Sequence, residues 1–335
     1  MDIALKEQHS VWRAKPRFAL SSPILPALFL LAMMLLSCRT APPMIPMQNE
    51  AVFIPMEPGG FAYVFIDVEG ARPILDNLSF RGLDTNDRQF RRILDSTQSA
   101  MAAIFMPRYG EPAGTRFRLV AQGRYPSGRA RMAMRCSRHW RGHRSAVSRN
   151  RFWYSAAGML SIAMSRNEAL VSSSLYNVPA DPFYTGPGTR IPDGFDEFRR
   201  GAVISCWLNE PGTFINQRLS DMHIPLEIPA EQFFVSLFPA PPAQTLAGNP
   251  NPTGEIHYVA HIRIQVESDV QARGFATILT LARTLFAPAE DGTIATALAS
   301  ILFANPTVAY DRYLLIKTNA MSAGEISLLF SMFLP

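Results

Sequence analysis

The chain has 335 residues, of which 48% are hydrophobic and 18% are charged, and this composition excludes a disordered protein. Its 27 prolines and 20 glycines are too few for a collagen-like or low-complexity chain, so a sizeable buried core is expected. The net charge of +5 hides a strong asymmetry, because residues 108–151 hold twelve arginines and one acid, Glu111, which gives a local net charge of +11.

The N-terminal 37 residues have the features of a bacterial export signal. The first 17 residues carry four basic side chains, Lys6, Arg13, Lys15 and Arg17. An apolar run follows over 19–36, and its unbroken part, 27–36, has ten residues. A membrane-spanning helix needs about 20 residues, so we interpret 1–37 as a cleaved signal peptide, with a transmembrane helix as the alternative.

The apolar run ends in the tetrapeptide Leu35-Leu36-Ser37-Cys38. This ending resembles the relaxed lipobox of spirochaetal envelope lipoproteins, with Leu36 standing where a small or β-branched residue is usual. The resemblance implies that Cys38 becomes residue one of the mature protein and carries fatty acyl chains such as palmitate, several of which anchor a protein stably. It therefore implies a protein lipid-anchored in the cell envelope, on the periplasmic face of the inner or outer membrane.

Residues 38–58 are expected to form a lipidated tether between the membrane and a folded body. The segment has few charges and five prolines, Pro42, Pro43, Pro46, Pro55 and Pro58. A Pro-rich chain is a semi-rigid spacer, so this segment would hold the body away from the bilayer.

The first half of the body, 59–174, is expected to form an α+β unit. Apolar, aromatic and β-branched runs predict its strands, and spacing of three to four residues between apolar side chains predicts its helices. The predicted strands cover 61–68, 99–105, 116–122, 152–156, 159–164 and 169–173, and the predicted helices cover 87–94 and 127–140.

A Pro- and Gly-rich linker, 175–200, leads to a second unit, 201–335, in which a similar order of elements is expected. The predicted strands cover 202–208, 231–238, 257–266, the region of 308, 313–318 and 326–330. The predicted helices cover 212–219 and 270–286, the latter extended by 294–303.

Both units therefore read as strand, helix, strand, strand, helix and three strands. We interpret the body as an α+β protein of two tandem units, each of mixed or antiparallel sheet with packed helices, related by an internal duplication. The alternative is one continuous α+β domain whose two halves resemble each other by chance.

The cysteines and histidines give weak indications of chemistry. Cys136 and Cys206 could form one disulfide in an oxidising compartment, and the alternative is two buried free thiols. Cys136, His139 and His143 have a spacing that would suit zinc on one helical stripe. Arginines interleave them, however, and repel a cation, so we expect no metal and no cofactor.

The Arg-rich segment contains the candidate binding residues. A helix over 127–140 would place Arg131, Arg135 and Arg138 on the face opposite its apolar stripe, and Arg141 and Arg144 follow directly. Such a face favours an anionic lipid, a glycan or an acidic protein as partner. The alternative is a solvated rim whose side chains cover apolar surface and pair with carboxylates. Export argues against nucleic acid, although Trp140 and Trp153 could stack on bases.

No catalytic motif supports an enzyme. The mature chain lacks the G-x-S-x-G, H-E-x-x-H, phosphate-loop and paired C-x-x-C patterns. We therefore expect a non-enzymatic envelope lipoprotein that binds an anionic or protein partner through its Arg-rich face. Two alternatives stay open: an amphiphile or lipid carrier, suggested by 15 methionines and 22 phenylalanines, and a periplasmic hydrolase of unrecognised type.

Overall fold

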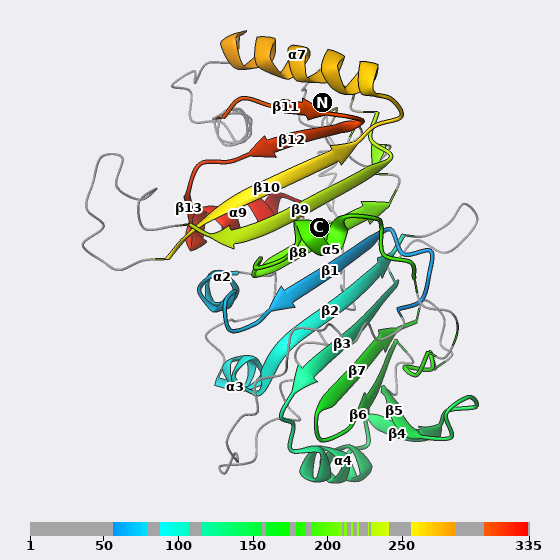
Figure 1. The fold of residues 1–335 in the computed structure, drawn as a ribbon. Coiled ribbons are helices and arrows are strands. Elements are labelled where there is room, and N and C mark those ends of the chain that lie inside the picture. Colours follow the sequence, from blue (N-terminus) through cyan, green and yellow to red (C-terminus); the bar gives the residue numbers. More distant parts are fainter. Residues whose placement is uncertain are drawn as a thin grey trace, which may run out of the picture.

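The computed structural model describes residues 56–78, 88–106, 116–155, 159–174, 179–209 except 185, 187 and 188, the single positions 211, 212, 216, 220 and 227, and 229–240, 256–285 and 305–333. Cys38, the predicted signal peptide and the tether up to residue 55 lie outside these residues. Within them, the chain forms an α+β fold built on a single antiparallel sheet of 13 strands (Figure 1).

The strands run across the sheet in the order β11-β12-β10-β9-β8-β1-β2-β3-β7-β6-β5-β4, and β13 pairs with one end of β10. Their bounds are β1 Ala62–Asp67, β2 Thr97–Phe105, β3 Arg116–Gly123, β4 Trp140–Arg144, β5 Arg151–Ser155, β6 Leu160–Met164, β7 Glu168–Ser173, β8 Ile204–Asn209, β9 Gln232–Pro239, β10 His257–Gln265, β11 Val308–Tyr310, β12 Tyr313–Lys317 and β13 Met321–Ser322. The helices are α2 Arg72–Asn77, α3 Arg88–Ser96, α4 Ser127–Cys136, α5 Phe195–Phe198, α7 Asp269–Leu285 and α9 Ala323–Phe333.

The centre of the sheet is the antiparallel pair of β1 and β8. Val64 lies opposite Cys206 on β8 and opposite Ala102 on β2. Outward from β1 the strands follow as β2, β3 and β7, and outward from β8 they follow as β9, β10 and β12. Strands from both halves of the sequence therefore share one sheet.

Side chains alternate between the two faces of the sheet, and each face has its own cover. Val64 and Ile66 pack with residues of α2 and α9. The same face carries α4, through Ala130 and Met134, and α7, through Ala272 and Leu279. The long helices thus lie on one face of the sheet.

The opposite face holds an aromatic cluster covered by the chain between β7 and β8. Tyr63 stacks on Trp207 with ring centroids 4.3 Å apart, and Phe195 of α5 packs edge-on against the same Trp207. Phe195 and Phe234 are fully buried. Figure 1 shows α5 lying over the middle of the sheet, which is where these rings meet.

The structure confirms most of the predicted strands, but it places them in one sheet and not in two separate units. The two predicted units do not build separate sheets, because β1 and β8 pair directly and join their strands. The apolar run 326–330 was expected to be a closing strand and lies instead in α9. A short apolar run does not distinguish a strand from a buried helix. Residues 213–215, 217–219 and 294–303 of the predicted helices lie outside the described part of the chain.

The predicted helix over 127–140 is too long. α4 ends at Cys136, and Ser137 is already extended, with φ −84° and ψ 135°. Residues 140–144 form β4, a strand that the sequence pattern did not predict. Of the three arginines predicted on one helical face, Arg131 and Arg135 are therefore on the helix and Arg138 lies beyond it. The other two candidate binding residues, Arg141 and Arg144, are on β4.

Candidate anion-binding site

A group of cationic side chains lies where the β4–β5 hairpin meets α4. β4 is the outermost strand on its side of the sheet and pairs with β5 in the register Trp140 to Ser155, Gly142 to Trp153 and Arg144 to Arg151. Because alternate residues share a face, Trp140, Gly142, Arg144, Arg151 and Trp153 all lie on the side of the hairpin that carries α4. The register therefore brings two tryptophans and two arginines onto one small surface.

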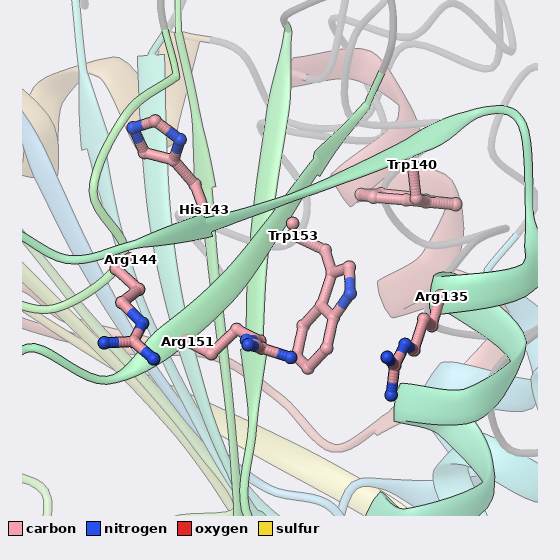
Figure 2. A pocket seen from close by; sticks show the side chains of 7 residues that line it. Arg135, Trp140, His143, Arg144, Arg151 and Trp153 are labelled. Carbon is pink, nitrogen blue, oxygen red and sulfur yellow. The ribbon is translucent and has the colours of Figure 1, made fainter.

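A surface depression of about 370 Å³ lies between this surface and α4. Its lining residues are Arg135, Trp140, Gly142, His143, Arg144, Arg151 and Trp153. Figure 2 shows Arg144 and Arg151 on one side of the Trp153 indole and Arg135 on the other, whereas the His143 ring points away. That ring packs edge-on against Phe152 on the opposite face of the hairpin, with centroids 5.5 Å apart.

The two tryptophans form the rigid part of this depression. Trp140 is 8% exposed and Trp153 is 5% exposed, and both belong to a core cluster with Ala130 and Met134 of α4. The helix thus fixes the two indoles, and the indoles fix the position of the hairpin against the helix. Arg135 comes from the last turn of α4, one residue after the buried Met134.

The turn of the hairpin holds Arg144 and Arg151 opposite each other. The Ser145 amide donates to the Asn150 carbonyl at 2.9 Å, and the Ser145 hydroxyl accepts from the amides of Val147 and Ser148. Arg149 takes up the left-handed backbone conformation, with φ 57°, that closes the turn. These contacts specify the register and therefore the placing of the two arginines.

The charge of the depression is not balanced by neighbouring acids. Arg135, Arg144 and Arg151 are exposed, and within the described residues none of the three makes an ion pair. Like charges placed directly opposite on neighbouring strands destabilise a sheet, and Arg144 and Arg151 are such a pair. The arrangement fits an anionic ligand, which would relieve this repulsion.

Gly142 places no side chain over the nitrogen edge of the buried Trp153 indole. A Cβ at position 142 would lie 3.8 Å from the indole nitrogen and 4.0 Å from Cδ1. The backbone of Gly142 is ordinary for a strand, since its φ is not among the positive values of this chain. In the described part of the chain the indole N–H of Trp153 has no hydrogen-bond acceptor. The indole N–H of Trp153 is therefore a free donor in the depression that Arg135, Arg144 and Arg151 also line.

The five arginines predicted from the sequence divide into three groups. Arg135 and Arg144 line the depression. Arg131 has a structural role, because its Nε and Nη2 donate to the Met164 carbonyl at 3.1 and 2.6 Å. Arg138 and Arg141 are exposed but do not line the depression, and alternation places Arg141 on the opposite face of β4.

Arg151 and Gly142 are the residues of this site that sequence reasoning missed. Arg151 was counted in the Arg-rich segment but not singled out, and Gly142 was given no role. The signal that could have found them is the repeat of alternating residues around a Ser/Asn-containing turn, Arg144-Ser145 to Asn150-Arg151. Alternation on both sides of such a turn is typical of a hairpin.

Another part of the Arg-rich segment is neutralised within the fold. Arg116 forms an ion pair with Glu57 at 2.9 Å, and Arg118 lies 3.6 Å from the same carboxylate. Arg118 also donates to the Asp181 carbonyl at 3.1 Å. Burial lowers the pKa of Arg118 despite the nearby Glu57. These two arginines join the segment before β1 and the linker to the sheet.

The cysteines and histidines do not form the clusters weighed from the sequence. Cys136 is exposed on α4 and Cys206 lies on β8, and both are free thiols. Burial raises the pKa of Cys206 to about 12. His143 lies on β4, not on a helical stripe with Cys136. The described residues contain no group of three or more His, Cys, Asp or Glu side chains that could hold a metal.

Comparisons with known proteins give a structural resemblance. No protein-family model and no curated protein sequence matches the chain. Among solved structures, crystal form III of TP0453, a spirochaete envelope protein of Treponema pallidum, matches with a TM-score of 0.53 and 14% identity, over 82% of this chain and 94% of that one. Crystal form I matches with a TM-score of 0.52 and 14% identity, over 83% and 95%. At this identity the resemblance establishes the fold.

Among the described residues, no helix is long and apolar enough to cross a bilayer.

Proposed function

We propose that this protein is a non-enzymatic envelope lipoprotein, anchored through Cys38, whose folded body binds anionic membrane surface through the exposed arginines of α4 and the β4–β5 hairpin. The observation that carries the proposal is the group of Arg135, Arg144 and Arg151 around one depression, without an acidic partner among the described residues. Arg138 and Arg141 extend the same positive region along the chain.

The energetics of membrane attraction support a role for so many exposed cations. Each Lys or Arg near an anionic bilayer contributes on the order of 1 kcal/mol, and the attraction decays within a Debye length. Several arginines held on α4 and the hairpin can therefore act together without a further cost for ordering the backbone. Acylation at Cys38 would keep the body close to the bilayer.

The envelope location rests on two independent supports. The first is the N-terminal sequence, with its basic start, apolar run and relaxed lipobox at Cys38. The second is the likeness of the fold to TP0453, a spirochaete envelope protein. No cofactor is part of the proposal. The amphiphile carrier and the hydrolase stay as alternatives without a specific observation in their favour.

An internal duplication is also part of the proposal. It is supported by the central pairing of β1 with β8 and by the matching outward order of β2, β3 and β7 on one side and β9, β10 and β12 on the other. Under this proposal the two predicted units, 59–174 and 201–335, are repeats that merged into one sheet, with 175–200 as the linker between them.

Vesicle co-sedimentation tests the binding. The full chain is mixed with phosphatidylcholine vesicles that contain or lack phosphatidylglycerol, as wild type and with Arg135, Arg138, Arg144 and Arg151 all replaced by Gln. Loss of four cations should weaken binding to the anionic vesicles by about tenfold or more. Raising the ionic strength should weaken wild-type binding in the same direction.

The matched control replaces four exposed arginines outside the Arg-rich segment, Arg190, Arg200, Arg273 and Arg312, with Gln. The wild type and both variants have the same N-terminal segment, so its contribution to vesicle binding does not affect the comparison. If both variants lose affinity equally, net charge and not the Arg-rich hairpin determines binding. If the wild type does not distinguish anionic from zwitterionic vesicles, the proposed function is wrong.

A further inference from the structure

We propose that the depression between α4 and the β4–β5 hairpin is a phosphate-binding site, to which Arg135, Arg144, Arg151 and the indole N–H of Trp153 contribute. This inference rests on the proposed function and adds to it a specific ligand chemistry. General attraction to a negative surface would need only the arginines. The phosphate site also needs the geometry of Trp153 and Gly142.

The donors of the depression match the acceptors of a phosphate. A guanidinium group is planar, stays charged at physiological pH and offers paired N–H donors, which suit the oxygens of a phosphate. Three such groups come from α4, β4 and β5, on both sides of the Trp153 indole (Figure 2). The seven lining residues include no carboxylate that would compete with the ligand.

The indole of Trp153 supplies a fixed neutral donor. Trp153 is 5% exposed and packed in the cluster that joins the hairpin to α4, so its ring is held in place by the fold. Figure 2 shows its nitrogen facing the side from which Arg135 comes. A buried or half-buried indole N–H usually has an acceptor, and this one has none within the described residues. A ligand oxygen would satisfy it.

Gly142 makes this donor accessible. A glycine weakens a strand, and it often marks a place where a ligand approaches the backbone. Here the backbone conformation does not require glycine, and a Cβ would meet its nearest atoms, both on Trp153, at 3.8 and 4.0 Å. A Cβ at 142 therefore fits the fold, and a larger side chain would extend toward the nitrogen edge of the indole.

The charge and number of the donors favour a phosphomonoester over a phosphodiester. A phosphomonoester carries a charge of about −1.5 to −2 at pH 7 and has three terminal oxygens, whereas a diester carries one charge and two such oxygens. Three cations and one neutral donor match the monoester better. The depression, of about 370 Å³, is larger than one phosphate and open, so the rest of the ligand can point outward. The phosphate could belong to a lipid headgroup or to a soluble molecule.

The first arm of the test uses soluble probes. Inorganic phosphate and glycerol 3-phosphate are titrated into the full chain while the indole N–H resonances of its four tryptophans are followed by NMR. The Trp153 resonance should shift most. Replacing Arg144 and Arg151 with Gln should weaken binding by about tenfold or more, because charge-assisted hydrogen bonds are lost. Replacing Arg200 and Arg312, which are exposed and lie outside the Arg-rich segment, with Gln removes the same charge and should leave this affinity within about twofold.

Gly142→Val tests the geometry at constant charge. The substitution should abolish the Trp153 shift and weaken phosphate binding by about tenfold, while the spectrum of the remaining residues shows a folded protein. If Gly142→Val binds phosphate as the wild type does, or if replacing Arg200 and Arg312 weakens binding as much as replacing Arg144 and Arg151, the depression is not a phosphate site.

The second arm distinguishes the source of the phosphate and separates the two proposals. Vesicles of phosphatidylcholine are doped with phosphatidic acid or with phosphatidylglycerol to the same zeta potential. A lipid headgroup ligand predicts tighter binding to phosphatidic acid, with the preference lost in Gly142→Val. Equal binding to both vesicles, together with binding of the soluble probes, supports a soluble phosphate ligand. Vesicle binding without any response to the soluble probes, and without a lipid preference, overturns the phosphate site and leaves the proposed function standing.

Discussion

Two groups of arginines, close together in the sequence, have opposite surroundings in this fold. Arg116 and Arg118 on β3 pair with Glu57, and Arg118 also donates to the chain between β7 and β8. Arg135, Arg144 and Arg151 surround an open depression and have no ion pair within the described residues. The comparison shows that arginine content alone does not indicate a binding surface. What matters is whether the fold supplies an acceptor.

The largest effect on stability is expected in the first group. Arg118→Ala should lower the free energy of unfolding by about 3 kcal/mol, because it leaves Glu57 with one partner fewer and removes a half-buried guanidinium that joins three segments. Chemical denaturation of the full chain measures this change. Arg144→Ala is the matched control, and a loss of the same size there would contradict the division into two groups.

Thiol reactivity gives the same contrast between interior and surface. Burial raises the pKa of Cys206 to about 12, whereas Cys136 is exposed beside Arg135. Because the thiolate is the reactive form, Cys206 should react with iodoacetamide at pH 8 more than about a hundredfold more slowly than Cys136. Site-resolved mass spectrometry measures both rates. Similar rates would mean that the centre of the sheet is open to solvent.

The raised pKa of Cys206 also predicts a dependence of stability on pH. Folding favours the protonated thiol, so the contribution is fully present below the ordinary thiol pKa of 9.0 and is lost as the pH rises from there toward about 12. The denaturation midpoint of the wild type should therefore fall between pH 8 and pH 10. In Cys206→Ala this part of the fall should disappear, and an unchanged fall would assign it to other groups.

The smallest effect is expected at the opposed arginines of the hairpin. Arg151→Gln removes a like-charge pair across two strands, so the free energy of unfolding should rise by roughly 0.2–1 kcal/mol. Adding anionic vesicles should reduce this gain, because the ligand relieves the same repulsion in the wild type. A destabilised Arg151→Gln would indicate that Arg151 has a structural partner.

Much of the sheet could be predicted from the sequence, because its strands are apolar runs of ordinary length. Residues 61–68 and 257–266 were recognised in this way and became β1 and β10. α9 was missed although Ser322 and Glu325 form a capping box, in which the Ser322 amide donates to Glu325 Oε2 at 2.7 Å and the Glu325 amide donates to the Ser322 hydroxyl at 3.2 Å. Because this capping box was not recognised, the apolar run 326–330 was predicted to be a strand.

The candidate site was harder to predict than the fold. β4 is an edge strand whose residues, apart from Trp140, are exposed, so it has no apolar alternation to reveal it. The spacing of Ala130, Ala133 and Cys136 also suggested a helix that would continue to Trp140. Without β4 there is no register, and without the register Gly142 cannot be placed opposite Trp153. The arginines could be counted from the sequence, but their separation into paired and unpaired groups required the tertiary structure.

The central claim is that Arg135, Arg144 and Arg151 are free to meet an anionic surface while Arg116 and Arg118 are not. Modification with phenylglyoxal, mapped residue by residue by mass spectrometry in the full chain, tests it most directly. The account predicts that the first three arginines react, that vesicles containing phosphatidylglycerol protect them and that phosphatidylcholine vesicles do not, while Arg116 and Arg118 react slowly throughout. Equal modification of both groups, or no protection by the anionic vesicles, would contradict it.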